Sequence, residues 1–259
     1  MAKKKTDEPK VYKEHPSVDQ RITDTLRENY MPYAMSVIVS RAIPEIDGFK
    51  PSHRKLLYTM YKMGLLNGNR TKSANIVGQT MKLNPHGDAA IYETMVRLTR
   101  GNEALLMPFV DSKGNFGKVY SRDMAYAAPR YTEAKLDAFC AELFRDIDTD
   151  AVDFVDNYDG EMKEPTLLPT TYPNILVSAN TGIAVGMATK IMPHNFNELL
   201  NAQISELRGE PFELFPDFQQ GGLMDVSDYQ DGNGKITLRA KIDIDGRKLI
   251  IREIPATTT

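Results

Sequence analysis

The sequence predicts an α+β fold that is mainly helical at first, contains a helix-turn-helix segment and continues into short strands. Three observations predict it. Apolar residues recur at helical spacing in several segments before residue 150. The break at residues 85–87 (PHG) separates two such helices, as in a helix-turn-helix motif. Residues 235–255 alternate apolar and polar side chains around an Asp-Gly turn, which is typical of a β-hairpin.

The composition is that of a globular protein. Of 259 residues, 41% are hydrophobic and 26% are charged, so the chain can build a sizeable core. The single cysteine, Cys140, excludes a disulfide within the chain and a cysteine-based metal site, and it fits a reducing compartment. Residues 1–10 lack the apolar core of a signal peptide, and no apolar run is long enough for a membrane span. We therefore expect a cytoplasmic protein without a membrane partner.

Charge is segregated along the chain, although the formal net charge is only −3. Residues 41–82 hold eight Lys or Arg and two acids, whereas residues 142–164 hold nine acids and two bases. A basic face of this kind can bind a polyanion such as DNA. The alternative is two solvated faces without a ligand, and charge alone favours that alternative.

The first elements are expected to be a flexible arm, residues 1–16, and a helix that Ser17 caps. Pro32 is expected to interrupt or restart this helix, because proline lacks the amide donor. Residues 33–44 (YAMSVIVSRAIP) are then expected to form a buried segment.

Three helices are expected next. One begins at Pro51, which suits a first helical turn, and ends at Gly64. A short one covers residues 73–81, and a third runs from an N-cap at Asp88 to Arg100. The expected inward positions are Leu56, Leu57, Met60 and Met63 in the first helix and Ile91, Met95 and Leu98 in the third. In DNA-binding versions of this motif, the N-terminal residues of the second helix lie at the groove.

Tyr131 is expected at the start of another amphipathic helix, with Thr132 as its cap. The apolar face of that helix would be Leu136, Phe139, Cys140, Leu143 and Phe144. The acidic residues 146–164 are expected to be a solvated linker at a domain boundary, followed by short strands and tight turns. Asn195 should begin the last helix, with Glu198 completing a capping box and Gly209 ending it.

Arg130 and Tyr131 form a pair suited to attack on a phosphodiester. A tyrosine hydroxyl has a pKa of about 10, so it is a weak nucleophile at neutral pH without activation. A guanidinium beside it can stabilise charge that develops on phosphate oxygens, and a helix N-terminus would add a positive field. The alternative is a packed structural tyrosine, one of 12 in the chain, and local features favour that alternative.

Other polar candidates lie on the predicted helices or just before them. His86 at the turn, and His53 beside Arg54 and Lys55, could bind phosphate or transfer a proton. Lys50 extends this basic group, for which the alternative is a solvated helix face. The chain contains no phosphate-binding loop, dinucleotide fingerprint or zinc motif, so we expect no nucleotide or metal site in it.

Seven segments occur in an order that resembles one family. They are YAMSVIVSRAIP, KPSHRKLLYTM, NPHGDAAIYETMVRL, GNFG, AAPRYTEAKL, EPTLLPTTYPNILV and TGIAVGMAT. The sequence is similar to the A subunit of bacterial type IIA DNA topoisomerases, the gyrase and topoisomerase IV family. The resemblance covers residues 17–258 and implies a winged-helix DNA-cleavage domain over residues 17–155, followed by part of a mixed α/β tower domain over residues 156–259.

The resemblance also implies a reaction. The phenolate of Tyr131 would attack a DNA phosphate to give a 5′-phosphotyrosyl bond and a free 3′-hydroxyl, with Arg130 stabilising the transition state. Arg41 and His86 match residues at the cleavage centre. The residues that match phosphate contacts are Lys50, His53, Arg54 and Lys55. Ile183 matches an apolar wedge that enters the base stack and bends DNA.

The implied partners are double-stranded DNA, a second A subunit, and a B subunit in an A2B2 complex at the nucleoid. Mg²⁺ would be held mainly by the B subunit, which would also use the ATP that drives strand passage. The resemblance leaves gyrase and topoisomerase IV both open. The chain is expected to be a fragment that is inactive alone.

Two departures from the family pattern bear on the site. Asn84 replaces the first histidine of the family's H-P-H-G-D motif, so an acid-base step would fall to His86 or to another group. The family anchors fluoroquinolones through a serine and an acid, which are Ala89 and Glu93 here. Because Ala89 has no hydroxyl for the water–metal bridge, we expect weakened drug binding.

Two other functions compete with a DNA-cleaving enzyme component. One is a non-catalytic winged-helix module that binds DNA, which a test for covalent protein–DNA chemistry distinguishes. The other is a structural or interaction domain, which failure to bind duplex DNA at low salt would favour.

Overall fold

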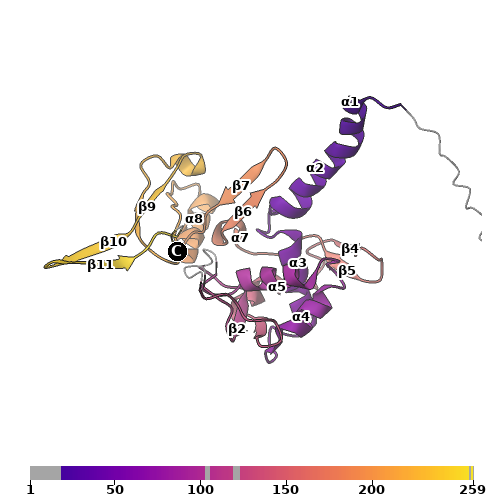
Figure 1. Ribbon diagram of the computed structural model, residues 1–259, viewed down its shortest axis with the longest axis horizontal. Coiled ribbons are helices and arrows are strands. Elements are labelled where there is room, and N and C mark those ends of the chain that lie inside the picture. The colour runs from indigo at the N-terminus through magenta and orange to yellow at the C-terminus, as the bar shows by residue number, and fades with distance from the viewer. Residues whose placement is uncertain (1–18, 103–105, 119–122, 257, 259) are drawn as a thin grey trace, which may run out of the picture.

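The structure is a computed structural model that describes residues 19–102, 106–118, 123–256 and 258. Helices and short strands are mixed along the described chain, as the α+β class predicts (Figure 1). The expected arm at residues 1–16 and the Ser17 cap lie outside the described residues.

A long helix projects from the body (Figure 1). It consists of α1 (Ile22–Thr25), η1 (Leu26–Tyr30), α2 (Met31–Val37) and η2 (Ile38–Ala42), of which η1 and η2 have π-helical turns. Of the two outcomes predicted at Pro32, an interruption or a restart of the helix, the structure shows a restart, since α2 begins at Met31. Pro32 lies in the first turn of α2, directly after a π-helical turn, where its missing amide proton and its ring are tolerated.

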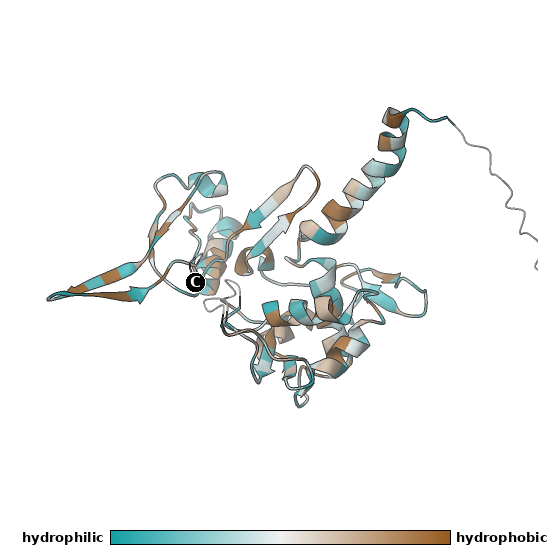
Figure 2. Cartoon of the chain, viewed as in Figure 1, coloured by the Kyte–Doolittle hydropathy of each residue, from teal (hydrophilic) through white to brown (hydrophobic). Residues whose placement is uncertain are grey.

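The prediction that residues 33–44 form a buried segment is wrong for most of the segment, although Ala34 and Ala42 are buried. Tyr33, Met35 and Val39 are 57%, 51% and 50% exposed, because the helix stands away from the body. Figure 2 shows hydrophobic residues along this helix and along the distant β10–β11 hairpin (β10, Lys241–Asp245; β11, Lys248–Glu253). Sequence hydrophobicity alone could not distinguish such exposed elements from core.

The body is built from three helices and a small sheet. The helices are α3 (Pro51–Lys62), α4 (Ser73–Thr80) and α5 (Asp88–Arg97). The antiparallel sheet has the order β1-β3-β2, with β1 at Thr71–Lys72, β2 at Val110–Lys113 and β3 at Glu133–Leu136. Predicted inward positions that are 5% exposed or less are Leu56, Leu57, Met60, Ile91, Met95 and Leu98. Met63 packs at the margin of this core.

Helix α5 departs slightly from its predicted bounds. Gly87, not Asp88, is the N-cap residue, and the helix ends at Arg97 rather than Arg100. Such shifts of a few residues at helix ends change neither the face that is buried nor the helix axis.

The helix predicted after Tyr131 is replaced by strand β3, the short turn η3 (Ala138–Cys140) and α6 (Ala141–Phe144). The strand forms because β2 pairs with β3 at four positions, a long-range contact that overrides local helical spacing. Thr132 is therefore not a helix cap. The predicted apolar face still reaches the core, since Leu136, Cys140 and Leu143 are 0% exposed.

The acidic residues 146–164 form more than a linker. They contain β4 (Phe154–Asp156) and run into β5 (Lys163–Pro165), and the two strands pair as a hairpin. Phe154 packs on Tyr58 with 6.0 Å between ring centroids, and Asn157 Nδ2 donates to the Lys82 carbonyl at 2.8 Å. This hairpin is therefore fixed to α3 and to the turn that follows α4. The predicted domain division between residues 155 and 156 stays a prediction.

The remaining elements are short, as the sequence predicts. They are α7 (Asn174–Val177), β6 (Asn180–Ile183), β7 (Ala188–Ile191), α8 (Phe196–Arg208), β8 (Leu223–Asp225), η4 (Gln230–Gly232) and β9 (Thr237–Arg239), followed by β10 and β11. Asn195 caps α8 by accepting from the amides of Asn197 and Glu198, and Gly209 ends it with φ 69°. The predicted last hairpin turns at Gly246 and Arg247.

Candidate nucleic-acid interface

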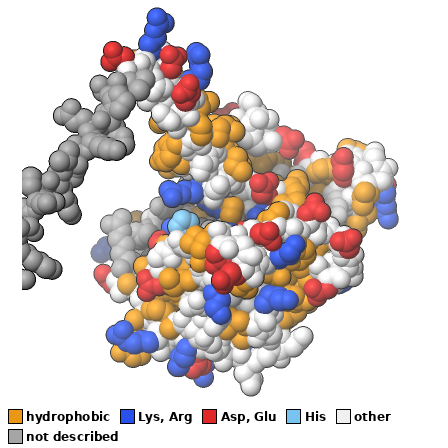
Figure 3. Space-filling model, turned by 90° about the vertical axis from the view of Figure 1, so that its right-hand side faces the viewer, with side chains coloured by type: hydrophobic (Ala, Val, Ile, Leu, Met, Phe, Trp, Pro, Cys, Tyr) orange, Lys and Arg blue, Asp and Glu red, His pale blue; other side chains and the backbone are white. Residues whose placement is uncertain are grey.

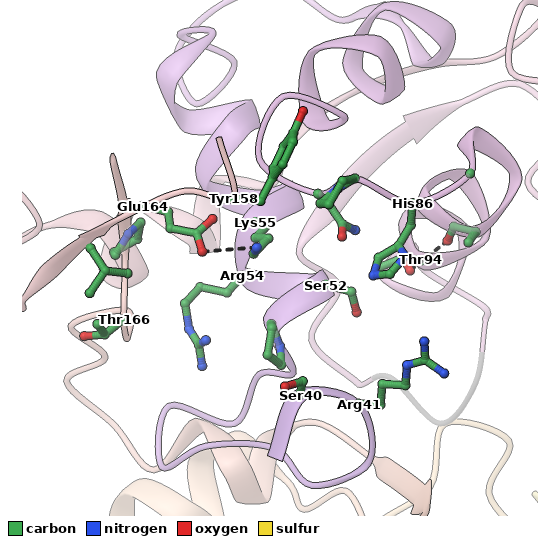
Figure 4. A pocket seen from close by; sticks show the side chains of 17 residues that line it. Ser40, Arg41, Ser52, Arg54, Lys55, His86, Thr94, Tyr158, Glu164 and Thr166 are labelled. Atoms are coloured by element: carbon green, nitrogen blue, oxygen red, sulfur yellow. Dashed lines mark hydrogen bonds and ion pairs between the residues drawn. The ribbon is translucent and has the colours of Figure 1, made fainter. Parts of the chain in front are cut away.

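A cleft of about 810 Å³ lies where the projecting helix meets α3, α5 and the β4–β5 hairpin. It brings together four residues predicted for the site, Arg41, Arg54, Lys55 and His86. Figure 4 shows Arg41 and His86 on its right and Lys55 with Glu164 on its left. In Figure 3, Lys or Arg and His side chains gather in the hollow under the projecting helix. Cations from distant segments thus meet at one concave surface, which suits a polyanion.

Arg54 is 6% exposed and is held by Asp47, itself 2% exposed. Arg54 Nε donates to Asp47 Oδ2 at 2.8 Å, and Arg54 Nη2 donates to Asp47 Oδ1 at 3.0 Å and to the Phe49 carbonyl at 3.2 Å. Asp47 also accepts from the amides of Phe49 and Leu168 at 3.0 and 2.9 Å. Arg54 is therefore a fixed cation that joins the start of α3 to the chain near residue 168.

Lys55 is also held in place. Its ammonium lies 3.1 Å from Glu164 Oε1 and donates to the Leu83 carbonyl at 2.9 Å. The other oxygen of Glu164 is buried, and no hydrogen bond to it is found in the described part of the chain. Because the pair is partly buried, solvent screens the attraction between Lys55 and Glu164 less than it would on an open surface, and this holds the ammonium in place.

A second cavity of about 310 Å³ contains the other predicted phosphate-binding residues, Lys50 and His53. Lys50 Nζ donates to the Thr181 carbonyl at 2.8 Å, which ties the start of α3 to β6. Burial, together with the charges of Lys50, Arg97 and Arg54, lowers the pKa of His53 to about 3. His53 is therefore neutral at pH 7, so it can exchange hydrogen bonds with a phosphate but adds no charge.

Sequence reasoning missed Arg97, Ser178 and Asn180, which line this second cavity. Ser178 Oγ and Asn180 Oδ1 are buried side-chain atoms for which the described residues provide no hydrogen-bond partner. The four-residue spacing of Glu93 and Arg97 predicts the ion pair that the structure shows at 2.9 Å, but it does not predict that Arg97 lines a cavity. Ser178 and Asn180 carried no signal in the sequence, since only the turn after α7 brings them to α3.

Tyr131 lies on the surface, where its side chain is 66% exposed, and the Arg130 guanidinium lies 4.7 Å from the centre of its ring. This contact is a cation–π interaction and places a fixed positive charge beside the phenol. The segment that follows Tyr131 is strand β3, so it does not supply the helix N-terminus that was predicted here. Neither Arg130 nor Tyr131 lines the cleft that contains Arg41 and His86.

Ile183 is 84% exposed and lies at the end of strand β6, where the β6–β7 hairpin turns. Strand β6 is packed against the end of the projecting helix at Gly182, directly before Ile183. A Cβ on Gly182 would lie 1.8 Å from the Ala42 carbonyl oxygen, so only glycine fits there. The same contact that presents Ile183 therefore also fixes the helix end that carries Arg41.

The positions predicted for drug contact lie on the outer face of α5. Ala89 and Glu93 are both exposed, four residues apart, and Glu93 is engaged by Arg97. Asn84 is 6% exposed, and its backbone amide donates to the Thr80 carbonyl at 2.9 Å. His86 is exposed in the cleft. Because residue 84 is an asparagine, His86 supplies the imidazole of this motif.

The described residues are a poor fit for a resident magnesium ion. Within the described ranges, no group of three or more His, Cys, Asp or Glu residues could hold a metal. The carboxylate in the cleft, Glu164, is paired with Lys55.

Among the helices of the described residues, none combines the length and the apolar character that a membrane span requires.

Comparison with known proteins gives a consistent family. Residues 41–259 match the family model for the A subunit of DNA gyrase/topoisomerase IV. The A subunit of DNA topoisomerase 4 from Borreliella burgdorferi is 44% identical over 236 residues, which is 90% of this chain and 36% of that protein. The A subunit of DNA gyrase from Staphylococcus aureus is 42% identical over 258 residues, which is 92% of this chain and 29% of that protein. The chain spans about a third of the length of these relatives.

Proposed function

Because the chain belongs to the A-subunit family of DNA gyrase and topoisomerase IV, we propose that it carries the DNA-cleaving part of a type IIA DNA topoisomerase. The Tyr131 oxygen forms a bond to a backbone phosphorus while the bond from phosphorus to the 3′ oxygen breaks. The phenol proton is released, and the departing 3′ oxygen takes up a proton. The 5′ end stays on Tyr131, and religation reverses these steps.

The observation that carries this proposal is the exposed phenol of Tyr131 beneath the Arg130 guanidinium. A nucleophile for a DNA phosphate must be reachable from solvent, and a fixed cation next to it stabilises negative charge on the phosphate oxygens. A guanidinium has hydrogen-bond donors and no acceptor, so Arg130 acts through charge and hydrogen bonds rather than as a base.

The cleft and the second cavity are proposed to hold the DNA backbone. Lys50 and Lys55 lie at the start of α3 beside Arg41 and can contact successive phosphates, while Arg54, whose charge is paired with Asp47, holds this helix in place. Ile183 then acts as the wedge, because it is an exposed branched side chain at the tip of an anchored hairpin. Inserting it between base pairs bends the duplex at the expense of stacking.

The cleavage centre is proposed to be completed by a second copy of the chain. Tyr131 and Arg130 do not line the cleft that holds Arg41 and His86. In a dimer, Tyr131 of one copy would reach the cleft of the other, and two such centres cut both strands of one duplex. His86 would protonate the departing 3′ oxygen, a role for which buried Asn84 has no suitable group.

The partners of the complex remain those that the family implies. A B subunit would supply Mg²⁺, held mainly on its own residues, and would use ATP in an A2B2 assembly at the nucleoid. Magnesium would stabilise charge on the reacting phosphate. The chain alone is expected to be inactive without these partners.

The experiment uses the full-length polypeptide with a topoisomerase B subunit, Mg²⁺ and labelled duplex DNA, stopped with detergent. We expect DNA covalently linked to the protein, and we expect Tyr131→Phe to abolish the adduct. Tyr30→Phe is the matched control, because Tyr30 is also exposed, at 46%, but lies on the projecting helix. Duplex binding without any adduct would instead establish the non-catalytic module, and failure to bind DNA at low salt would establish a structural domain.

A further inference from the structure

The residues before β3 form a loop, 127–132, that carries Tyr131 and is fixed from beneath by three buried hydroxyl groups. We propose that Ser73, Thr132 and Tyr92 position this loop, and hence Tyr131, for attack on DNA. The inference rests on the proposed function, because it assigns positioning residues to the same nucleophile. None of the three contacts DNA in this proposal, since all are 3% exposed or less.

The backbone of the loop is bound to the start of α4. The amides of Ser73 and Ala74 donate to the carbonyls of Thr132 and Pro129 at 3.0 and 3.2 Å. The first amides of a helix have no acceptor within the helix, so the loop takes the place of a cap. It is also closed on itself, because the Tyr131 amide donates to the Ala128 carbonyl at 2.9 Å.

The three hydroxyls connect the loop to both helices. Thr132 Oγ1 lies 2.8 Å from Ser73 Oγ on α4 and 2.9 Å from the Tyr92 hydroxyl on α5, which donates to the Ala127 carbonyl at 2.8 Å. Burial raises the pKa of Tyr92, so it keeps the proton that it donates. Thr132 donates to Ser73 Oγ, and the Tyr92 hydroxyl donates to the Ala127 carbonyl, so the loop is bound to both α4 and α5.

The other side of the loop is bounded by Gly114. Its φ is 106°, and a Cβ there would lie 3.3 Å from Thr132 Cγ2 and 3.4 Å from the Tyr131 carbonyl. The amide of Ala127 donates to the Asn115 carbonyl at 2.9 Å. Thr132 is thus enclosed by α4, α5 and the loop at residues 114–117, and it fixes the backbone next to Tyr131. With the backbone held in this way, the phenol of Tyr131 can move only by rotation about its side-chain bonds.

Placement of this kind matters more for the rate of attack than for DNA binding. A displacement of about 1 Å at a reacting group can lower a rate on the order of 100-fold. Binding depends on the many phosphate contacts of the cleft, which the hydroxyls do not touch. A merely structural role predicts lower stability with normal cleavage by the folded protein, whereas a positioning role predicts slow cleavage at saturating DNA.

The test compares Thr132→Val, Thr132→Ser and Tyr92→Phe in the full-length polypeptide with Mg²⁺ and the B subunit. Single-turnover cleavage of a nicked duplex that cannot be religated gives the rate at saturating DNA, while a separate titration gives the Kd. We expect Thr132→Val and Tyr92→Phe to lower this rate by about tenfold or more with an unchanged Kd. Thr132→Ser keeps the hydroxyl and should restore most of the rate.

Thr80→Val is the matched control. Thr80 is also 0% exposed on α4, but its hydroxyl donates to the Ile76 carbonyl at 2.8 Å and has no bond to the loop. It should lose stability yet cleave like the parent protein. If Thr132→Val proves unstable, Tyr92→Phe, which keeps the ring, decides the matter.

The outcomes separate the two proposals. Parent-like cleavage by Tyr92→Phe and folded Thr132→Val overturns the positioning role, while loss of the adduct in Tyr131→Phe would leave the proposed function intact. An equal loss of rate in Thr80→Val also overturns the positioning role. A parent protein that forms no adduct overturns both proposals.

Discussion

Replacing Asp47 with alanine should lower the free energy of unfolding by about 3–5 kcal/mol, the cost of breaking a buried ion pair from one side. The change leaves Arg54 as a cation that is 6% exposed without its carboxylate. It also removes the acceptor for the amides of Phe49 and Leu168. The removed carboxylate accepts four hydrogen bonds of 2.8 to 3.0 Å, which is why the upper part of that range is expected.

Asp111→Ala provides the comparison. Asp111 accepts both its hydrogen bonds from Arg70 at 2.6 and 2.7 Å, but the two side chains are 28% and 37% exposed. A pair open to solvent contributes about 0.2–1 kcal/mol, despite its short distances. Burial, rather than distance, should therefore separate the two variants.

The assay is equilibrium unfolding in urea. The chain has no tryptophan, so far-ultraviolet circular dichroism and tyrosine fluorescence serve as the two probes, and their agreement tests two-state behaviour. A loss below about 1 kcal/mol for Asp47→Ala, or one no larger than that of Asp111→Ala, would refute the reasoning.

Three further predictions concern the site. Gly182→Ala should lower the melting temperature and weaken DNA cleavage, because its Cβ would overlap the Ala42 carbonyl, whereas Gly78→Ala, inside α4 with open space around it, should stabilise the protein by about 0.4–1 kcal/mol; equal effects would contradict the packing argument. The pKa of His53 is lowered from 6.5 to about 3, so unfolding favours its protonation, and the parent should lose more stability than His53→Gln as the pH falls from 6.5 towards 3; parallel melting curves across that window would count against it. Ala89→Ser should increase fluoroquinolone inhibition of the assembled enzyme, and an unchanged inhibitory concentration would show that the missing hydroxyl does not limit binding.

Local signals were sufficient for several helices. Pro51 and Gly64 bracket α3, and Asn195 and Gly209 bracket α8, because capping and left-handed termination depend on neighbouring residues only. The helix predicted after Tyr131 is wrong because the structure of that segment depends on a distant part of the chain. Its apolar positions fit a helix, but pairing with β2 makes it a strand, and that partner lies about 20 residues earlier in the chain.

The site could be predicted only through the family resemblance. Arg41, Lys55 and His86 lie on separate segments, and no periodicity shows that they share a cleft. The buried pairing of Arg54 with Asp47 was also hidden, since the turn between them, with Gly48 at φ 79°, brings the two side chains together. From the residue types alone, Lys50, Arg54 and Lys55 are expected to be solvated cations. In the structure each of them donates hydrogen bonds to protein acceptors.

The tethering of Lys50 and Lys55 by protein acceptors has a thermodynamic consequence. A lysine or arginine that moves freely in water loses rotamer freedom worth up to about 2 kcal/mol when a ligand immobilises it. Here that freedom was already given up when the chain folded. A polyanion arriving at this surface meets charges that need little further ordering, so less of the binding energy is lost as entropy.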